Sequence, residues 1–213
     1  MDRTITSIEV QKKDSNRFSI FLDGEFAFGI HKDVLLESGI ARGDRLTESQ
    51  VETIKKREEV KKAKIKAVRL LSVRARSKQE LDERLKRSGF STGAIDETLR
   101  ELERLDLVND AEFAVLFART KMAQKPQGKM ALSLELKKKG IEETAIENAI
   151  AKAYEGTNES EVAFSLANRK KQQFGNLEEQ KAKKRLSDYL LRRGFRFDVV
   201  RDVLENWNHL ELE

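Results

Sequence analysis

One pattern of apolar residues and a glycine occurs three times in this chain of 213 residues. In each copy, two leucines four residues apart are followed by a glycine and then by two further apolar residues, always at the same offsets. The copies are Leu81, Leu85, Gly89, Ile95 and Leu99; Leu132, Leu136, Gly140, Ile146 and Ile150; and Leu186, Leu190, Gly194, Val200 and Leu204. Their spacings of 51 and 54 residues are typical of supersecondary units that stack on one another.

Each copy predicts the same local structure. Leucines at i and i+4 form the apolar stripe of a helix, and the glycine ends that helix in the left-handed conformation. The last two apolar positions begin the stripe of a following helix, and a further helix precedes each copy, at about 58–75, 110–124 and 159–174. Because such a module cannot bury its apolar faces alone, we expect a mainly α protein of tandem three-helix repeats stacked into an elongated array. The alternative is a single helical bundle with chance periodicity.

The first 57 residues follow a different pattern. Asp23-Gly24 lies between the apolar runs 18–22 and 26–30, and Asp-Gly in that setting is the strongest short-range hairpin signal. We prefer a three-residue loop, Asp23-Gly24-Glu25, because a two-residue loop would divide the apolar side chains between the two faces. The longer loop predicts three cross-strand pairs: Leu22 with Phe26, Ile20 with Phe28, and Phe18 with Ile30.

Three more signals complete this region. Residues 4–10 alternate and predict a third strand, residues 31–38 predict a short helix closed by Gly39, and the capping box Thr47-Glu48-Ser49-Gln50 opens a second helix. We therefore expect four parts: an N-terminal β-hairpin or three-stranded sheet with short helices at 1–57, and three-helix repeats at 58–109, 110–156 and 157–213.

The composition argues against most kinds of active site. The chain has no cysteine and only two histidines, His31 and His209, which excludes disulfides and Cys-type zinc sites and leaves little for a histidine-based centre. No phosphate-binding or metalloprotease motif occurs. The N-terminus starts no apolar segment, and the longest apolar run, 113–118, is too short to span a bilayer. We expect a cytoplasmic protein that is not an enzyme and holds no metal or cofactor.

Charge alternates in phase with the repeat. Three basic blocks, 55–87, 119–140 and 168–196, carry net charges of +9, +6 and +7, and the two blocks between them each carry −5. Each basic block covers the end of a module's first helix and its second helix. Stacking equivalent helices would therefore place basic segments along one side of the array.

Two interpretations of this alternation remain open. The charges can be ordinary solvated faces, or complementary charges that hold neighbouring modules together. They can instead form a basic strip that lies along an extended anionic object such as a nucleic acid. Phe113, Phe117, Phe164 and Phe195 fall on apolar stripes, and the candidates for exposed rings are Phe174, Tyr189 and Trp207. With so few rings, nucleic acid would bind mainly through its phosphates.

Several short motifs carry a family resemblance. In the first module these are Arg74-Ala75-Arg76-Ser77, Glu80-Leu81 and the run Leu105-Asp106-Leu107-Val108-Asn109-Asp110 leading into Phe113-Ala114 and Phe117-Ala118-Arg119. In the second they are Lys125-Pro126-Gln127-Gly128, Glu135-Leu136 and Lys139-Gly140-Ile141. Over about residues 58–207 the chain resembles the RecX family of recombinase regulators, closely in two modules and more loosely in the third.

The resemblance implies a partner and an activity. Members of the family bind the RecA recombinase filament in its helical groove and inhibit its ATPase, strand-exchange and co-protease activities, in DNA repair, recombination and the SOS response. The resemblance implies no role for the N-terminal 57 residues. We expect a monomer whose modules make several weak contacts along the filament, a geometry that gives high avidity when the spacing fits.

The expected contact residues are basic and come from all three modules. They are Arg74, Arg76 and Lys78; Lys125, Lys129, Lys137 and Lys138; and Lys184, Arg185, Arg192 and Arg193. The main rival hypothesis is a protein that binds single- or double-stranded DNA directly, without sequence preference, through the same basic strip. A further rival is a scaffold for an acidic protein unrelated to recombination.

Overall fold

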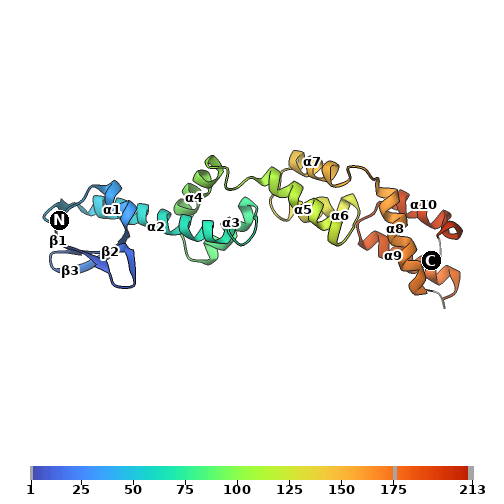
Figure 1. Ribbon diagram of the computed structural model, residues 1–213, viewed down its shortest axis with the longest axis horizontal. Helices are drawn as coiled ribbons and strands as arrows, with labels where there is room; N and C mark the ends of the chain where they lie inside the picture. Colours follow the sequence, from blue (N-terminus) through green and yellow to red (C-terminus); the bar gives the residue numbers. More distant parts are fainter. Residues whose placement is uncertain (1, 175–176, 211–213) are drawn as a thin grey trace. The chain divides into compact units, whose positions relative to one another are not determined.

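The structure, a computed structural model, describes residues 2–174 and 177–210. By their contacts these residues form two compact units, which are described separately. The first unit consists of Met1–Ala75 and Glu80–Val108, and the second of Arg76–Gln79 and Asn109–Glu213. Figure 1 shows the strands at the N-terminal end of the chain and α-helices in the rest of it.

The first unit begins with a four-stranded antiparallel sheet. Its strands are β1 Arg3–Gln11, β2 Asp14–Leu22, β3 Glu25–His31 and β4 Arg45–Leu46, in the order β3-β2-β1-β4. The predicted third strand beside the hairpin is confirmed, and the short β4 was not predicted. One face of the sheet is buried through Ile5, Ile20, Leu22 and Ile30, which pack with Val34 and Ile54 of the following helices.

The hairpin differs from the prediction at its tip. Two of the predicted pairs are confirmed, Phe18 with Ile30 and Ile20 with Phe28. The third is wrong, because Leu22 pairs with Glu25. The loop is therefore only Asp23 and Gly24, with φ of 51° and 85°, as a type I′ turn requires. A bulge in the β2–β3 pairing keeps Leu22 on the buried face and leaves Phe26 60% exposed.

Two helices follow the sheet. Helix α1, Lys32–Ser38, ends at Gly39 with φ of 62°, and α2, Glu48–Leu71, begins with the predicted capping box of Thr47 and Gln50. Helix α2 is continuous over 24 residues, so the helix predicted to open at residue 48 and the one predicted at 58–75 are a single helix. The N-terminal sheet and the first repeat therefore share α2.

A buried carboxylate joins α2 to the sheet. Glu58 is 4% exposed, and its two oxygens accept hydrogen bonds from the Arg17 guanidinium at 2.8 Å and from the His31 backbone N–H at 2.7 Å. A buried charge is tolerated only when it is paired and hydrogen-bonded, and both partners come from strands. Glu58 thus fixes the middle of α2 against β2 and β3.

The first repeat consists of the second half of α2 with α3, Lys78–Arg87, and α4, Thr92–Arg104. Its core is the predicted set of Leu81, Leu85, Ile95 and Leu99 packed against alanines of α2. All four leucine and isoleucine side chains are at most 4% exposed. The predicted three-helix module is confirmed here.

The second unit contains the other two repeats. The second repeat is α5 Asp110–Gln124, α6 Lys129–Lys137 and α7 Glu143–Ala153; the third is α8 Glu159–Lys171, the 3₁₀ turn η1 Gln172–Phe174, α9 Glu179–Arg192, α10 Phe197–Glu205 and the 3₁₀ turn η2 Trp207–His209. The predicted leucine pairs are buried, and so are Ile146 and Val200, which lie six residues after the glycine of each repeat. The last position of the pattern, Ile150 and Leu204, is only half-buried.

The glycines of the pattern end the second helix of every repeat, as predicted. Gly89, Gly140 and Gly194 have φ of 84°, 77° and 77°. The residue after each glycine donates its N–H to the carbonyl of the second leucine, at 3.4, 3.3 and 3.2 Å in the three repeats. This 6→1 bond is the signature of a Schellman turn, and the apolar residue that makes it packs back on the helix.

Within the second unit, hydrogen bonds hold the backbone of Pro126, Gln127 and Gly128 in the loop before α6. The Arg193 guanidinium donates to the Pro126 carbonyl at 3.0 Å, and the Gly128 N–H donates to the Arg193 carbonyl at 2.8 Å. The Tyr154 hydroxyl donates to the Gln127 carbonyl at 2.6 Å. Burial, and secondarily the Glu159 carboxylate, raises the pKa of Tyr154, which keeps this donor protonated. The loop thus joins the second repeat to the third.

Close backbone approach completes this joint. A Cβ atom on Gly128 would overlap the carbonyl group of Gly194, and a Cβ on Gly194 would overlap Ala131. The first N–H of α6, on Lys129, donates to the Glu159 carboxylate at 2.9 Å. An equivalent bond of 2.8 Å runs from the Lys78 N–H to the Asp110 carboxylate.

We predict that Leu136→Ala destabilises the second repeat. Leu136 is fully buried, and leucine-to-alanine changes at such sites cost about 2–5 kcal/mol, through lost transfer energy and a residual cavity. Native-state hydrogen exchange of the α6 and α7 amides measures the loss. The matched control is Leu134→Ala, two residues away and 54% exposed, which should leave exchange nearly unchanged. Equal effects of the two changes would contradict the assigned core.

We also predict that Gly128→Ala loosens the joint between the second and third repeats. The new methyl group has no space beside the Gly194 carbonyl, and overpacking of this kind costs about 1–3 kcal/mol. The amides of residues 128 and 129 should then exchange faster. Gly93→Ala in α4 is the control, because nothing lies near its Cβ position and alanine is the better helix former. An unchanged exchange rate in the Gly128 variant would show that the joint is not tight.

Candidate partner-binding surface

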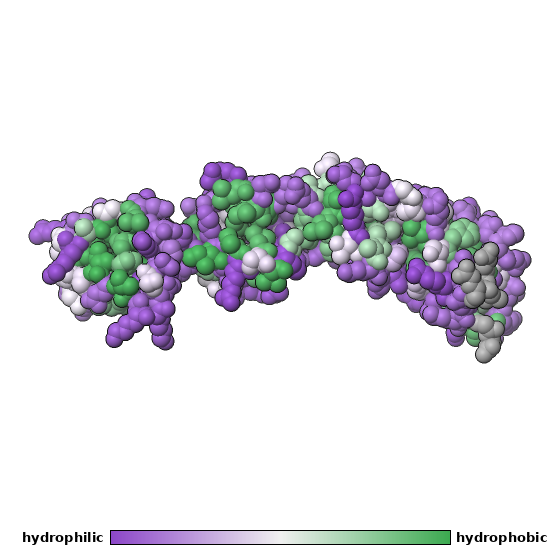
Figure 2. All heavy atoms as spheres, viewed as in Figure 1, coloured by the Kyte–Doolittle hydropathy of each residue, from purple (hydrophilic) through white to green (hydrophobic). Residues whose placement is uncertain are grey.

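The candidate site is a set of basic side chains, and the structure places them in different surroundings. On the face drawn in Figure 2, polar and charged residues cover most of the surface and apolar residues gather in separate patches. A side chain is the better candidate for contact with a partner the more exposed it is and the weaker its ion pairs within the chain are. We therefore compare the exposure and ion pairs of each predicted residue.

The predicted residues of the first module are the least accessible to a partner. Arg74 is exposed but forms an ion pair with Glu80 at 2.8 Å and donates to the Ala75 carbonyl. Arg76 is buried, at 9% exposure, which leaves little of it for a partner. Lys78 is half-buried. The prediction missed these surroundings because the segment before α3 has no helical period from which burial can be read.

The second-module residues are more accessible. Lys125, Lys129, Lys137 and Lys138 are all exposed. Lys137 pairs with Glu143 at 2.7 Å, and the Lys129 ammonium lies 5.1 Å from the centre of the Tyr154 ring. Lys125 and Lys138 form no ion pair with any residue that the structure describes.

The third-module residues divide into two kinds. Lys184, Arg185 and Arg192 are exposed on α9 and make no ion pair within the described ranges. Arg193 is half-buried: it bonds the Pro126 carbonyl and lies 5.2 Å from the Tyr189 ring centre. Arg193 is therefore part of the joint between repeats.

One exposed position is basic in every repeat. The residue two places before the glycine is Arg87 in the first repeat, Lys138 in the second and Arg192 in the third, and all three are exposed. Arg87 was not among the predicted contacts, although the repeat alignment alone would have identified it. Its ion pair with Glu83, at 3.4 Å on the surface, contributes little energy. A charge that recurs at one position of a repeat presents the same group once per module.

Residues predicted from different repeats meet in a basic cleft of the second unit. Lys125 and Arg193 line a cavity of about 360 Å³ together with Arg169 and Lys170 of α8 and the Tyr189 ring. Arg169 and Lys170 were missed because the prediction favoured the second helix of each module. They stand in the basic block that starts at residue 168.

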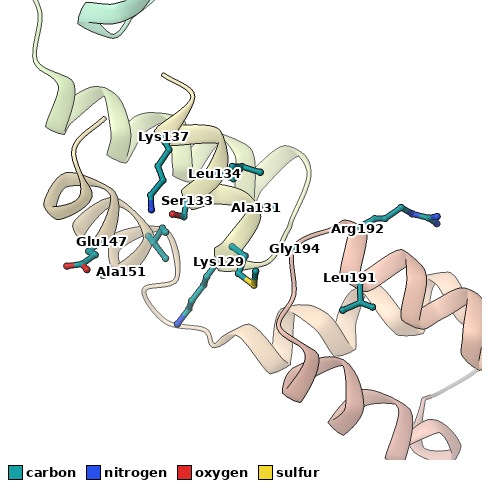
Figure 3. Close-up of a pocket in the computed structure, with 12 residues that line it drawn as sticks. Lys129, Ala131, Ser133, Leu134, Lys137, Glu147, Ala151, Leu191, Arg192 and Gly194 are labelled. Atoms are coloured by element: carbon teal, nitrogen blue, oxygen red, sulfur yellow. The ribbon is translucent and has the colours of Figure 1, made fainter. Parts of the chain in front are cut away.

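A second set of predicted residues borders an apolar groove. Lys129 and Lys137 on α6 and Arg192 on α9 line a cavity of about 820 Å³, with Glu147 of α7 opposite. Figure 3 shows α6 between α7 and the end of α9, with Arg192 extending away from α6. The apolar residues of the groove were not predicted as functional: Met130, Ala131, Leu134, Ile150, Ala151 and Leu191.

The aromatic residues differ in part from the prediction. Phe113 and Phe195 are buried, as expected, but Trp207 is also buried, at 7% exposure. Phe174 and Tyr189 are partly buried against the core of the third repeat. The expectation of an exposed Trp207 is wrong because η2 turns its ring into the core, where the Lys171 ammonium lies 4.9 Å from the ring centre. Phe197, 70% exposed, was not predicted.

Neither a metal centre nor a membrane span stands out. In the part of the chain that the structure describes, no group of three or more acidic or histidine side chains is placed to hold a metal ion. Within the same residues, no helix has the length and apolar character needed to cross a membrane.

Relatives that match nearly the whole chain are named as regulatory proteins. The chain is 33% identical over 205 residues to "Regulatory protein RecX" of Bacillus cytotoxicus, covering 94% of this chain and 76% of the relative. It is 32% identical over 209 residues to the protein of that name from Listeria welshimeri, covering 98% and 77%. A crystal structure of regulatory protein RecX superposes with a TM-score of 0.78 at 25% identity, covering 95% of this chain and 99% of that one.

Four domain models of one family match the chain in order. Residues 3–47 match the regulatory protein RecX N-terminal domain. Residues 63–102, 109–150 and 158–204 match the first, second and third three-helix domains of RecX. With four RecX domain models matched in order and relatives 32–33% identical over most of both chains, the chain belongs to the RecX family of regulatory proteins.

Proposed function

We propose that this RecX family protein binds the RecA filament on DNA and restrains its ATPase, strand-exchange and co-protease activities, acting by binding and not by catalysis. Membership of a regulatory family over nearly the whole chain supports the proposal. The observation that carries it is the recurrence of an exposed cation at one position of each repeat, Arg87, Lys138 and Arg192. The proposal places the protein in the cytoplasm, where RecA acts in DNA repair and the SOS response.

A repeated cation suits a repeated partner. A filament presents the same subunit surface at regular intervals, so equivalent side chains on successive repeats can contact equivalent acidic groups. Each exposed pair alone contributes little, but contacts made simultaneously add through a high effective concentration. A protein that bridges neighbouring subunits opposes the subunit movements that hydrolysis and strand exchange require.

Direct binding to DNA is the second candidate, and the basic cleft favours it. Lys125, Arg169 and Lys170 line one cavity with the Tyr189 ring and the joint residue Arg193, and cations beside an aromatic ring are found in single-strand binding sites. Binding there would run mainly through phosphates, with steep salt dependence and no sequence preference.

Charge reversal at the recurring position tests the filament proposal. We expect R87E/K138E/R192E to weaken inhibition of the DNA-dependent RecA ATPase roughly 10-fold or more, because three attractive contacts become repulsive. The measurement is a titration of protein into the ATPase assay at two salt concentrations, with helical content checked by circular dichroism. The matched control is K12E/K13E/R57E, which reverses three exposed cations outside these positions. Unchanged inhibition by the first variant, or an equal loss in both, would contradict the proposal.

Binding to bare DNA separates the two candidates. Affinities for single- and double-stranded DNA and for the assembled filament are measured by fluorescence anisotropy across a salt series. A filament complex that is much tighter and less salt-sensitive than either DNA complex supports filament regulation. If the protein binds bare DNA and the filament with equal affinity, and R169E/K170E weakens both, direct DNA binding is favoured.

A further inference from the structure

The groove beside α6 exposes apolar side chains that the fold does not use. Met130 and Leu134 lie one turn apart on α6 and are 60% and 54% exposed, and Leu191 at the end of α9 is 41% exposed. They line the same cavity of about 820 Å³ (Figure 3). Single exposed apolar residues are common on proteins, but a contiguous apolar patch marks an interaction site.

The equivalent positions of the other two repeats show whether the fold needs these apolar residues. At the positions of Met130 and Leu134, the first repeat carries Gln79 and Glu83, and the third carries Lys184 and Asp188. All three repeats nevertheless form the same three helices. Apolar side chains at these two positions are therefore not needed to fold a module.

Leu191 follows the same rule. Its equivalents in the first and second repeats are Lys86 and Lys137. The apolar lining thus combines two differences in the second repeat with one in the third, and all three residues line one cavity. Independent departures from a polar pattern that meet at one place are evidence for a ligand there.

The charges around the groove indicate what kind of ligand fits. Lys129, Lys137 and Arg192 line it together with the carboxylate of Glu147, and Lys137 is already paired with Glu143. The Lys129 ammonium lies over the Tyr154 ring, and neither Lys129 nor Arg192 forms an ion pair in the described part of the chain. An apolar floor with a cationic border is complementary to apolar side chains flanked by acidic ones.

We propose that this groove binds a protein segment that carries apolar side chains on one face, with Asp or Glu beside them. The inference rests on the proposed function in taking the RecA filament as the partner that presents the segment. Apolar side chains of the segment pack between Met130, Leu134 and Leu191, and its carboxylates face Lys129 and Arg192. DNA has no apolar side chains to fill the groove, so the proposed ligand of the groove is a protein. The basic cleft, which suits nucleic acid, is a separate site.

The test replaces the apolar pair by the residues that the first repeat already uses. M130Q/L134E should fold, because Gln79 and Glu83 occupy these positions in the first repeat. We expect roughly 10-fold or more weaker binding to the filament, since anchor residues buried in a pocket dominate interface energies. The loss should persist at high salt, because packing is not screened, and binding to bare DNA should be unchanged. The control is Leu116→Glu, a residue of α5 that is 57% exposed and outside the groove.

The outcomes separate this inference from the proposed function. If the wild-type protein does not bind the filament, the proposed function fails. If it binds, and M130Q/L134E binds equally well or loses no more than the Leu116 variant, the groove proposal fails. A photo-crosslinker placed at residue 134 then identifies the occupant by mass spectrometry. A crosslink to an acidic, apolar segment of RecA supports the proposal, whereas a crosslink to DNA or to a second copy of this chain overturns it.

Discussion

The arrangement of both later repeats depends on the turn that follows the second helix. In each repeat a leucine carbonyl accepts the N–H of the residue after a left-handed glycine. That bond reverses the chain tightly enough for the next apolar residue to return to the same core. In the third repeat, the turn also contacts the second repeat, because the absence of a side chain on Gly194 lets the backbone of Gly128 approach it directly.

This close approach determines what surface the second unit can offer. Since the joint is built from backbone groups and from Arg193, Tyr154 and Glu159, its side chains are committed to structure. The apolar groove and the basic cleft both lie beside the joint and draw residues from both repeats. Both candidate sites therefore take their geometry from this joint and from its two glycines, Gly128 and Gly194.

Local signals in the sequence predicted most of the fold, and tertiary contacts decided the rest. The helix ends at Gly89, Gly140 and Gly194 were predictable because positive φ is a local preference of glycine. The pairing of Leu22 was not, because a bulge in the hairpin compensates for the shorter loop. The burial of Arg76 and Trp207 was not predictable either, since neither residue lies on a clear apolar stripe.

The sequence predicted that the candidate surface is basic, but not which of its basic side chains are exposed. Net charge located the basic blocks, yet charge counts do not distinguish Arg193, which binds a carbonyl in the joint, from Arg192, which extends into solvent. Comparison of the three copies makes a finer distinction. Where all copies keep leucine, the residue lies in the core; where all keep a cation, as at Lys138 and its equivalents, we propose a repeated contact with the partner. Where one copy alone is apolar, as at Met130, the fold does not require the apolar side chain, which is why we propose that a partner uses it.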